Sequence, residues 1–211
     1  MSGCLYCIDN DIIKKLATFD LFNETVQCFG IEPQQIRILG TAKYKFNQDW
    51  AKFKSGKSRK AQDNVTNYEK ILELAESLPT ILDSEIDSEV FAALSQDKDI
   101  QAGEAILASH IVRVLQQPSP NEAFVLTGDK VFLRTLAMLD IPDIQVSLIN
   151  RIWCLEQLVL QNVKVYGFEV VCRKIVPVRE CDMAIKAVFG SGTQAVPDNA
   201  LVTLQSQGNR I

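Results

Sequence analysis

Short apolar runs alternate along the chain with longer stretches in which apolar residues recur every three or four positions. Short continuous runs are typical of strands buried on both faces, whereas the longer periodicity is typical of helices that cover a sheet. The alternation predicts an α/β protein, a three-layer α/β/α fold with a central parallel sheet. Strands are expected at residues 4–8, 80–82, 123–127 and 144–148.

Capping signals place the expected helices. Asn10 or Asp11 can cap a helix that runs to residue 19, and Gly30 can end the next one. Further helical patterns start at residue 32 and after Asn150, and cover 67–78, 87–94, 100–117, 130–139 and 180–189. The segment 162–178 has no clear period and is expected to be mixed.

The chain of 211 residues is expected to have three parts. They are an α/β domain over residues 1–150, a strand and helix extension packed on it over 151–189, and a loosely ordered tail over 190–211. The tail is rich in Gly, Ser, Gln and Asn. No apolar stretch approaches the roughly 18 residues of a membrane span, and the first residues do not form a signal peptide. Six cysteines without such a signal predict reduced thiols and a cytoplasmic protein.

Charge argues against a general polyanion binder, because Lys and Arg number 22 against 26 Asp and Glu, a net charge of −4. A local basic stretch, residues 43–60, nevertheless mixes cations with aromatic residues, as single-stranded RNA sites do. Its Phe46, Trp50 and Phe53 have helical spacing and equally fit a buried stripe. The residues expected to contact RNA are Lys43, Lys45, Lys54, Lys57, Arg59, Lys60 and Lys130.

Two aspartates follow apolar runs far apart in the sequence. Asp9 follows the run 4–8, and Asp129 follows 123–127 after Gly128. If these strands are neighbours, their carboxyl ends meet at one edge of the sheet. Carboxylates so close repel one another unless a cation compensates, and Mg²⁺ or Mn²⁺ would suit oxygen ligands. Either residue could instead be a simple helix cap.

A third acid, Glu104, lies near the start of the expected helix 100–117, directly after Gly103. Glycine inside a helix costs about 1 kcal/mol relative to Ala, so we expect Gly103 to make room for a close approach. Without a functional role, Glu104 would interact with the helix dipole in the first turn.

The segments DND, AGEA and TGDK, in this order, resemble the motifs of the PIN-domain family over roughly residues 4–150. That family has an α/β/α fold with a parallel sheet, and its active members are Mg²⁺- or Mn²⁺-dependent ribonucleases, many of them toxins of toxin–antitoxin pairs. The resemblance implies Asp9, Glu104 and Asp129 as catalytic residues and metal ligands, with Asp11 as a further ligand. It implies RNA as substrate, and an antitoxin, another protein or a second copy of the chain as partner.

The chain departs from the family's pattern at residues 35–46, where a further Glu is usual. Thr41, Ala42 and Lys43 stand there instead. One carboxylate fewer weakens metal binding, which leaves open a domain that binds RNA or protein without cleaving. In a third alternative, the DND segment also resembles the haloacid dehalogenase family of phosphatases, in which Asp9 would be the nucleophile and Asp11 the acid.

Overall fold

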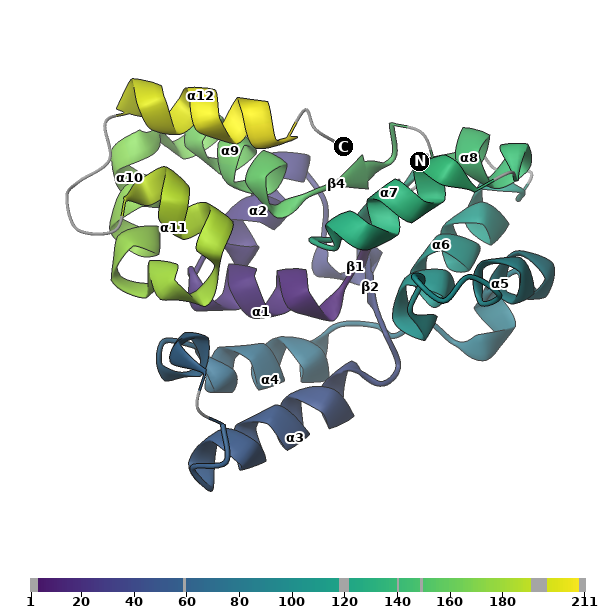
Figure 1. The fold of residues 1–211 in the computed structure, drawn as a ribbon, viewed down its shortest axis with the longest axis horizontal. Coiled ribbons are helices and arrows are strands. Elements are labelled where there is room, and N and C mark those ends of the chain that lie inside the picture. Colours follow the sequence, from purple (N-terminus) through teal and green to yellow (C-terminus); the bar gives the residue numbers. More distant parts are fainter. Residues whose placement is uncertain are drawn as a thin grey trace.

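A computed structural model describes residues 4–58, 60–117, 122–139, 141–148, 150–190 and 197–208 (Figure 1). Four parallel strands form one central sheet in the order β2-β1-β3-β4. They are β1 (Cys4–Ile8), β2 (Ile36–Ile38), β3 (Glu122–Leu126) and β4 (Ile152–Trp153). Helices cover both faces of this sheet, which confirms the expected three-layer α/β/α fold.

The helices form two groups, one for each face of the sheet. The first group comprises α1 (Asn10–Thr18), α2 (Phe22–Phe29), α3 (Ala42–Lys54), α4 (Tyr68–Ser77), α9 (Leu155–Tyr166), α10 (Phe168–Ile175), α11 (Met183–Phe189) and α12 (Pro197–Gly208). The second comprises α5 (Ser88–Leu94), α6 (Ala102–Leu115), α7 (Lys130–Met138) and α8 (Pro142–Leu148). Short 3₁₀ turns are η1 (Pro33–Gln35), η2 (Ala61–Asn64), η3 (Asp83–Glu85) and η4 (Val176–Cys181).

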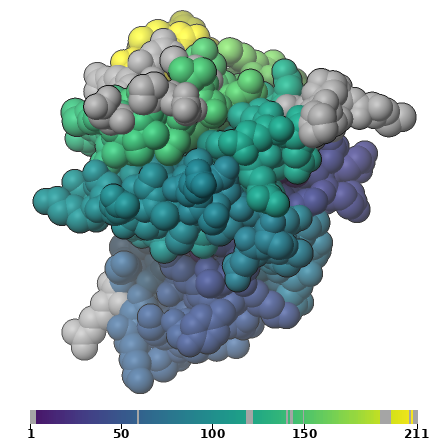
Figure 2. Space-filling model, turned by 90° about the vertical axis from the view of Figure 1, so that its right-hand side faces the viewer, coloured from purple at the N-terminus to yellow at the C-terminus, as the bar shows by residue number. Residues whose placement is uncertain are grey.

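Alternation along β1 divides the core between the two faces. Tyr6 and Ile8 pack in the cluster on the side of α1 and α9, whereas Leu5 and Cys7 pack in the cluster on the side of α5 to α8. Successive residues of a strand point to opposite faces, so one short strand supplies both cores. Figure 2 shows α5 and α6, in teal, across one side of the molecule, above the blue region of α3 and α4.

Residues 144–148 belong to helix α8, so the strand expected there is wrong. Ile144 and Leu148 are buried, while Val146 between them is 71% exposed. In a strand, these three residues would share one face; burial four residues apart is the helical pattern. The last strand is instead β4, after the turn at Asn150.

Two further expectations for strands and helices differ from the structure. The helical pattern expected from residue 32 contains only the short turn η1, and β2 follows, with Ile36 and Ile38 buried at the sheet. At residues 80–82 the expected strand is reduced to a single bridge, in which Thr80 pairs with Ile38.

The segment expected to be loosely held contains helix α12 over Pro197–Gly208. Ala200 and Leu204 of this helix are buried, with exposed fractions of 1% and 0%. Helix α12 packs along α9, and the Gln157 amide donates to the Gly208 carbonyl at 3.4 Å. The amphipathic spacing of a few apolar residues therefore outweighs the polar composition.

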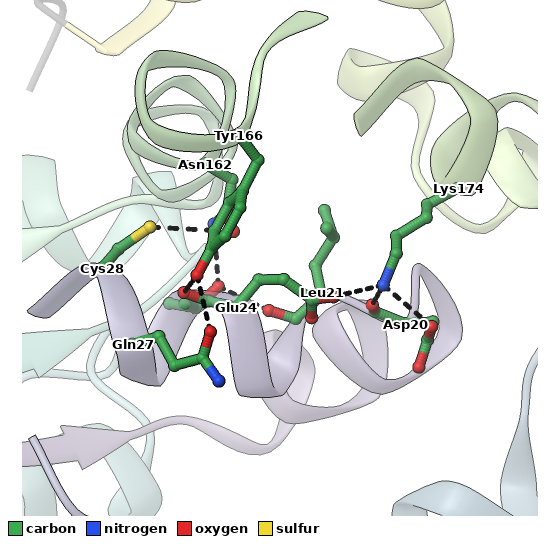
Figure 3. Close-up of polar contacts among 9 residues, drawn as sticks. Asp20, Leu21, Glu24, Gln27, Cys28, Asn162, Tyr166 and Lys174 are labelled. Carbon is green, nitrogen blue, oxygen red and sulfur yellow. Dashed lines mark hydrogen bonds and ion pairs between the residues drawn. The ribbon is translucent and has the colours of Figure 1, made fainter. Parts of the chain in front are cut away.

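Polar contacts fasten α9 and α10 to α2 (Figure 3). The buried Asn162 amide donates to Thr25 Oγ1 at 2.9 Å, and the Tyr166 hydroxyl donates to Gln27 Oε1 at 2.8 Å. Lys174 Nζ donates to the Asp20 carbonyl at 2.6 Å and forms ion pairs with Asp20 and Glu24. These contacts link residues more than a hundred positions apart and fix the C-terminal helices on the N-terminal ones.

Among the described residues, no helix is both long and apolar enough to cross a membrane. All six cysteines are free thiols. Cys4 and Cys7 lie on β1, where their odd spacing directs them to opposite faces of the sheet.

Candidate functional site

A pocket of about 490 Å³ opens at the carboxyl edge of the sheet. The strands β1 and β3 are direct neighbours, with Ile8 opposite Leu126, so the residues that follow them emerge side by side. The Asp9 amide also donates to the Leu126 carbonyl at 2.9 Å. The residues that line the pocket are Asp9, Asn10, Asp11, Leu39, Thr41, Lys45, Gln101, Gly103, Glu104, Gly128, Asp129, Lys130 and Val131.

Asp9 leaves β1 and caps α1, with its Oδ1 accepting from the Asn10 amide at 2.7 Å. Burial, and then the negative charge of Asp11, raise the pKa of the Asp9 carboxyl. Lys45 on α3 lowers the same pKa, because a nearby cation favours the carboxylate. One neighbouring carboxylate and one ammonium group therefore shift the pKa of the partly buried Asp9 in opposite directions.

Asp129 leaves the turn after β3 and caps α7. Its Oδ1 accepts from the amides of Val131 at 2.7 Å and Phe132 at 3.0 Å. The helix-cap role considered from the sequence is therefore confirmed, and the Asp129 side chain also lines the pocket.

Glu104 lies in the first turn of α6 and is only 5% exposed. Its Oε2 accepts from the Gln101 amide at 2.9 Å in a capping box, which is a more specific contact than the expected dipole interaction. The pKa of Glu104 is raised to about 7 by burial, by the charge of Asp129 and a hydrogen bond with it, and by the charge of Asp9. The structure therefore brings the three acids expected from the sequence into one electrostatically coupled group.

Asp11, expected as a fourth acid, is held by a different partner. It forms an ion pair with Lys15 one turn along α1, and Lys15 also contacts Asp182 Oδ2 at 2.8 Å. Asp182 caps α11, so this cluster ties the rim of the pocket to the C-terminal helices. A Cβ added at Gly128 would lie 3.2 Å from Asp11 Oδ2, so Gly128 makes room for this ion pair.

Gly103 makes room for a protein side chain. A Cβ at this position would lie 2.9 Å from Leu39 Cδ1, closer than carbon atoms approach. Leu39 follows β2 and is 5% exposed, so the missing side chain lets the end of α6 pack against the sheet edge. The same packing brings Glu104 toward Asp129.

Two features of the pocket were not expected from the sequence. Asn10 is 6% exposed, and its Oδ1 is buried without a hydrogen-bond partner among the described residues. Lys45, expected only as an RNA contact, lines the pocket beside Asp9. Asn10 is the middle residue of the DND segment, so the sequence already pointed to it. The position of Lys45 depends on how α3 packs, which the sequence does not show.

Of the other basic residues expected to contact RNA, Lys130 also lines the acidic pocket, and the described ones among the rest lie on α3 or directly after it. Lys43 pairs with Glu76 at 3.0 Å, and Lys130 pairs with the buried Glu156 at 3.0 Å. Lys54 lies over the Trp50 ring at 3.5 Å from its centroid. The exposed Lys57 and Lys60 follow α3, and Arg59 lies outside the described residues.

The aromatic residues of α3 have the burial expected of a packed stripe. Phe46 is 2% exposed, and Trp50 and Phe53 are partly buried against the same core cluster. The Phe53 ring also stacks on Tyr68 of α4 at 5.5 Å between centroids. Their helical spacing therefore serves the core.

The donor set of the pocket suits a hard cation, since carboxylates and an amide oxygen are the ligands that Mg²⁺ and Mn²⁺ prefer. In the part of the chain that the structure describes, no three His, Cys, Asp or Glu side chains are already arranged to hold a metal ion. Binding one would therefore need side-chain rotation, for which Glu104 would release its contact with the Gln101 amide.

Comparisons with protein-family models, with curated proteins and with solved structures found no match for this chain.

Proposed function

We propose that the pocket at the carboxyl edge is the active site of a metal-dependent ribonuclease. The observation that carries the proposal is the convergence of Asp9, Glu104 and Asp129, from three separate segments, on one pocket. Asp129 and Asp9 raise the pKa of the buried Glu104, an unfavourable arrangement of carboxyl groups, and residues with such perturbed pKa values gather at functional sites.

Asp9 and Asp129 would hold the cation, and Glu104 would complete the set after losing its proton. A bound Mg²⁺ or Mn²⁺ would lower the pKa of a water molecule and neutralise charge on a phosphodiester. Asn10 Oδ1, a buried oxygen without a partner among the described residues, is a further donor at the same edge. The chemistry of this donor set fits a divalent cation.

The chain's own residues supply a proton site and a phosphate contact. While no cation is bound, the Glu104 carboxyl holds its proton up to about pH 7, so it is a proton site that would release its proton when a divalent cation binds. Lys45 forms no ion pair among the described residues and lines the pocket, so its ammonium group is free to bind a phosphate of the RNA. Lys130 instead remains paired with Glu156.

The test is cleavage of a fluorescent single-stranded RNA in the presence of Mn²⁺, comparing the wild type with Asp129→Asn. Asparagine caps helices as well as aspartate does, so α7 is preserved while the charge is removed. We expect cleavage to be lost and the circular dichroism spectrum to be unchanged. Equal cleavage by both proteins would refute the assignment.

A second candidate is a domain of this fold that binds RNA without cutting it. Lys45 favours this candidate, because its ammonium group near Asp9 supplies part of the positive charge that a metal would supply. Under this alternative Lys45→Ala would weaken RNA binding, and Mn²⁺ would have no effect on it. Filter binding with and without Mn²⁺ distinguishes the two candidates.

A further inference from the structure

A second pocket, of about 460 Å³, lies at the opposite edge of the sheet. It is formed at the amino ends of β1 and β2, by the residues of η1 and η3 and by one side of α6. In Figure 2 the violet-blue segment that precedes β2 borders the teal segments at this edge. The lining residues are Cys4, Leu5, Gln34, Gln35, Arg37, Ser84, Glu85, His110, Arg113, Val114 and Gln117.

Two arginines give this pocket a positive charge. Neither Arg37 nor Arg113 has an ion-pair partner among the described residues. Arg37 Nη1 donates to the carbonyls of Gln34 at 2.7 Å and Ile36 at 3.1 Å, which fixes its position. Arg113 is exposed and makes one long contact, 3.5 Å, to the Ile86 carbonyl. A guanidinium group has five N–H donors, so most of those on both arginines remain available.

Among the described residues, Glu85 is the only carboxylate that lines this pocket, and it has another role. Its Oε2 accepts from the Leu82 amide at 3.0 Å, in the cap of η3. The pocket therefore keeps an excess of positive charge in a chain whose net charge is −4.

His110 adds a buried acceptor. It is 4% exposed, and its Nδ1 lies 2.7 Å from the Glu85 carbonyl oxygen. A carbonyl can only accept, so Nδ1 carries the proton and Nε2 is left as an acceptor. Burial, together with Arg37 and Arg113, lowers the pKa of His110 and keeps the ring neutral.

His110 Nε2 has no partner in the described part of the chain. A buried polar atom without a partner costs about 1–3 kcal/mol, so native structures seldom leave one unsatisfied. Among the described residues only one other side-chain atom is in this state, Asn10 Oδ1, which belongs to the acidic pocket. The two unpartnered atoms thus mark the two pockets at opposite edges of the sheet.

We propose that the pocket at the amino edge binds a small phosphate ester that also carries a hydroxyl group. A phosphomonoester has a charge of about −1.5 to −2 near neutral pH, which matches two arginines better than a single carboxylate does. Arg37 and Arg113 would bind the phosphate through paired N–H groups, and the hydroxyl would donate to His110 Nε2 after a shift of the side chains that cover this buried atom. The volume suits a sugar phosphate or a mononucleotide.

The test uses ribose 5-phosphate and adenosine monophosphate as probes, with inorganic phosphate for comparison. His110 is the only histidine in the chain, so its ¹⁵N imidazole signals identify the site without assignment of the whole spectrum. We expect saturable binding of both esters, tighter than that of inorganic phosphate, and a shift of the Nε2 signal on binding.

Matched variants locate the site. Arg113→Gln should raise the Kd of the esters about tenfold or more, as expected for loss of a charged hydrogen bond. Arg173→Gln removes the same charge from an exposed arginine on α10 and should leave the Kd unchanged. The absence of binding, an equal effect of the two variants, or an unshifted Nε2 signal would overturn the proposal. Asp129→Asn should not alter binding; if it does, the esters occupy the acidic pocket and the proposal fails.

Discussion

Replacing Glu104 by glutamine should stabilise the protein, and the gain should depend on pH. In the folded chain the pKa of Glu104 is raised from 4.5 to about 7 by burial and by its acidic neighbours. The protonated group therefore favours folding fully below pH 4.5, and this contribution is lost as the pH rises through about 7. Glutamine cannot ionise, so the Glu104→Gln variant keeps this contribution to stability at high pH.

The size of the effect follows from the shift in pKa. At 1.36 kcal/mol for each pKa unit, the rise amounts to a limit of about 3 kcal/mol, and about 2–3 kcal/mol of it falls between pH 5 and pH 8. Glutamine can keep the capping box, in which Glu104 Oε2 accepts from the Gln101 amide. The substitution therefore removes the charge and keeps the local hydrogen bond, so the change in stability measures the effect of the charge alone.

The assay is urea denaturation of wild type and Glu104→Gln at pH 5 and pH 8, with EDTA in every sample. We expect nearly equal free energies of unfolding at pH 5 and a more stable variant at pH 8. Glu76→Gln, at an exposed position of α4, is the control, and its effect should show little dependence on pH. A difference between wild type and Glu104→Gln that stays constant with pH would refute the electrostatic reasoning.

Three other substitutions test the fold and the site. Asn162→Ala should lower the free energy of unfolding by about 2 kcal/mol in urea denaturation, because the fully buried Asn162 amide of α9 donates to Thr25 of α2. Leu204→Ala should cost about 2–4 kcal/mol if α12 is packed as described, whereas Val202→Ala, 64% exposed, should cost less than about 0.5 kcal/mol. Lys45→Ala should raise the pKa of Asp9 and tighten Mn²⁺ binding in calorimetry, because it removes a competing cation; weaker Mn²⁺ binding would contradict this.

The carboxyl edge of the sheet could be anticipated from the sequence because strand direction is enough to define it. Apolar runs that end in Asp9 and Asp129 place both residues at one edge once the strands are parallel neighbours, and β1 and β3 are such neighbours. The position of Glu104 at this edge depends on how α6 packs. The sequence feature that pointed to this packing was Gly103, because Leu39 occupies the space that a side chain at position 103 would fill.

Features that depend on tertiary packing were not predictable in the same way. A short apolar segment such as 144–148 fits a strand or a helix, and only the exposure of Val146 in the folded chain distinguishes them. The same holds for the pairing of Asp11 with Lys15 and Asp182, which joins residues of α1 to the start of α11. The polar composition near α12 concealed a helix because only a few apolar residues, among them Ala200, Leu201 and Leu204, pack it on the core.

The metal site is tested by calorimetric titration of Mn²⁺ into the wild type and Asp129→Asn. We expect saturable binding by the wild type that strengthens as the pH rises through about 7, because Glu104 must release its proton. We expect Asp129→Asn, with α7 still capped, to lose this binding. Binding that is equal in both proteins, or absent from both, would contradict the assignment of a metal site to Asp9, Glu104 and Asp129.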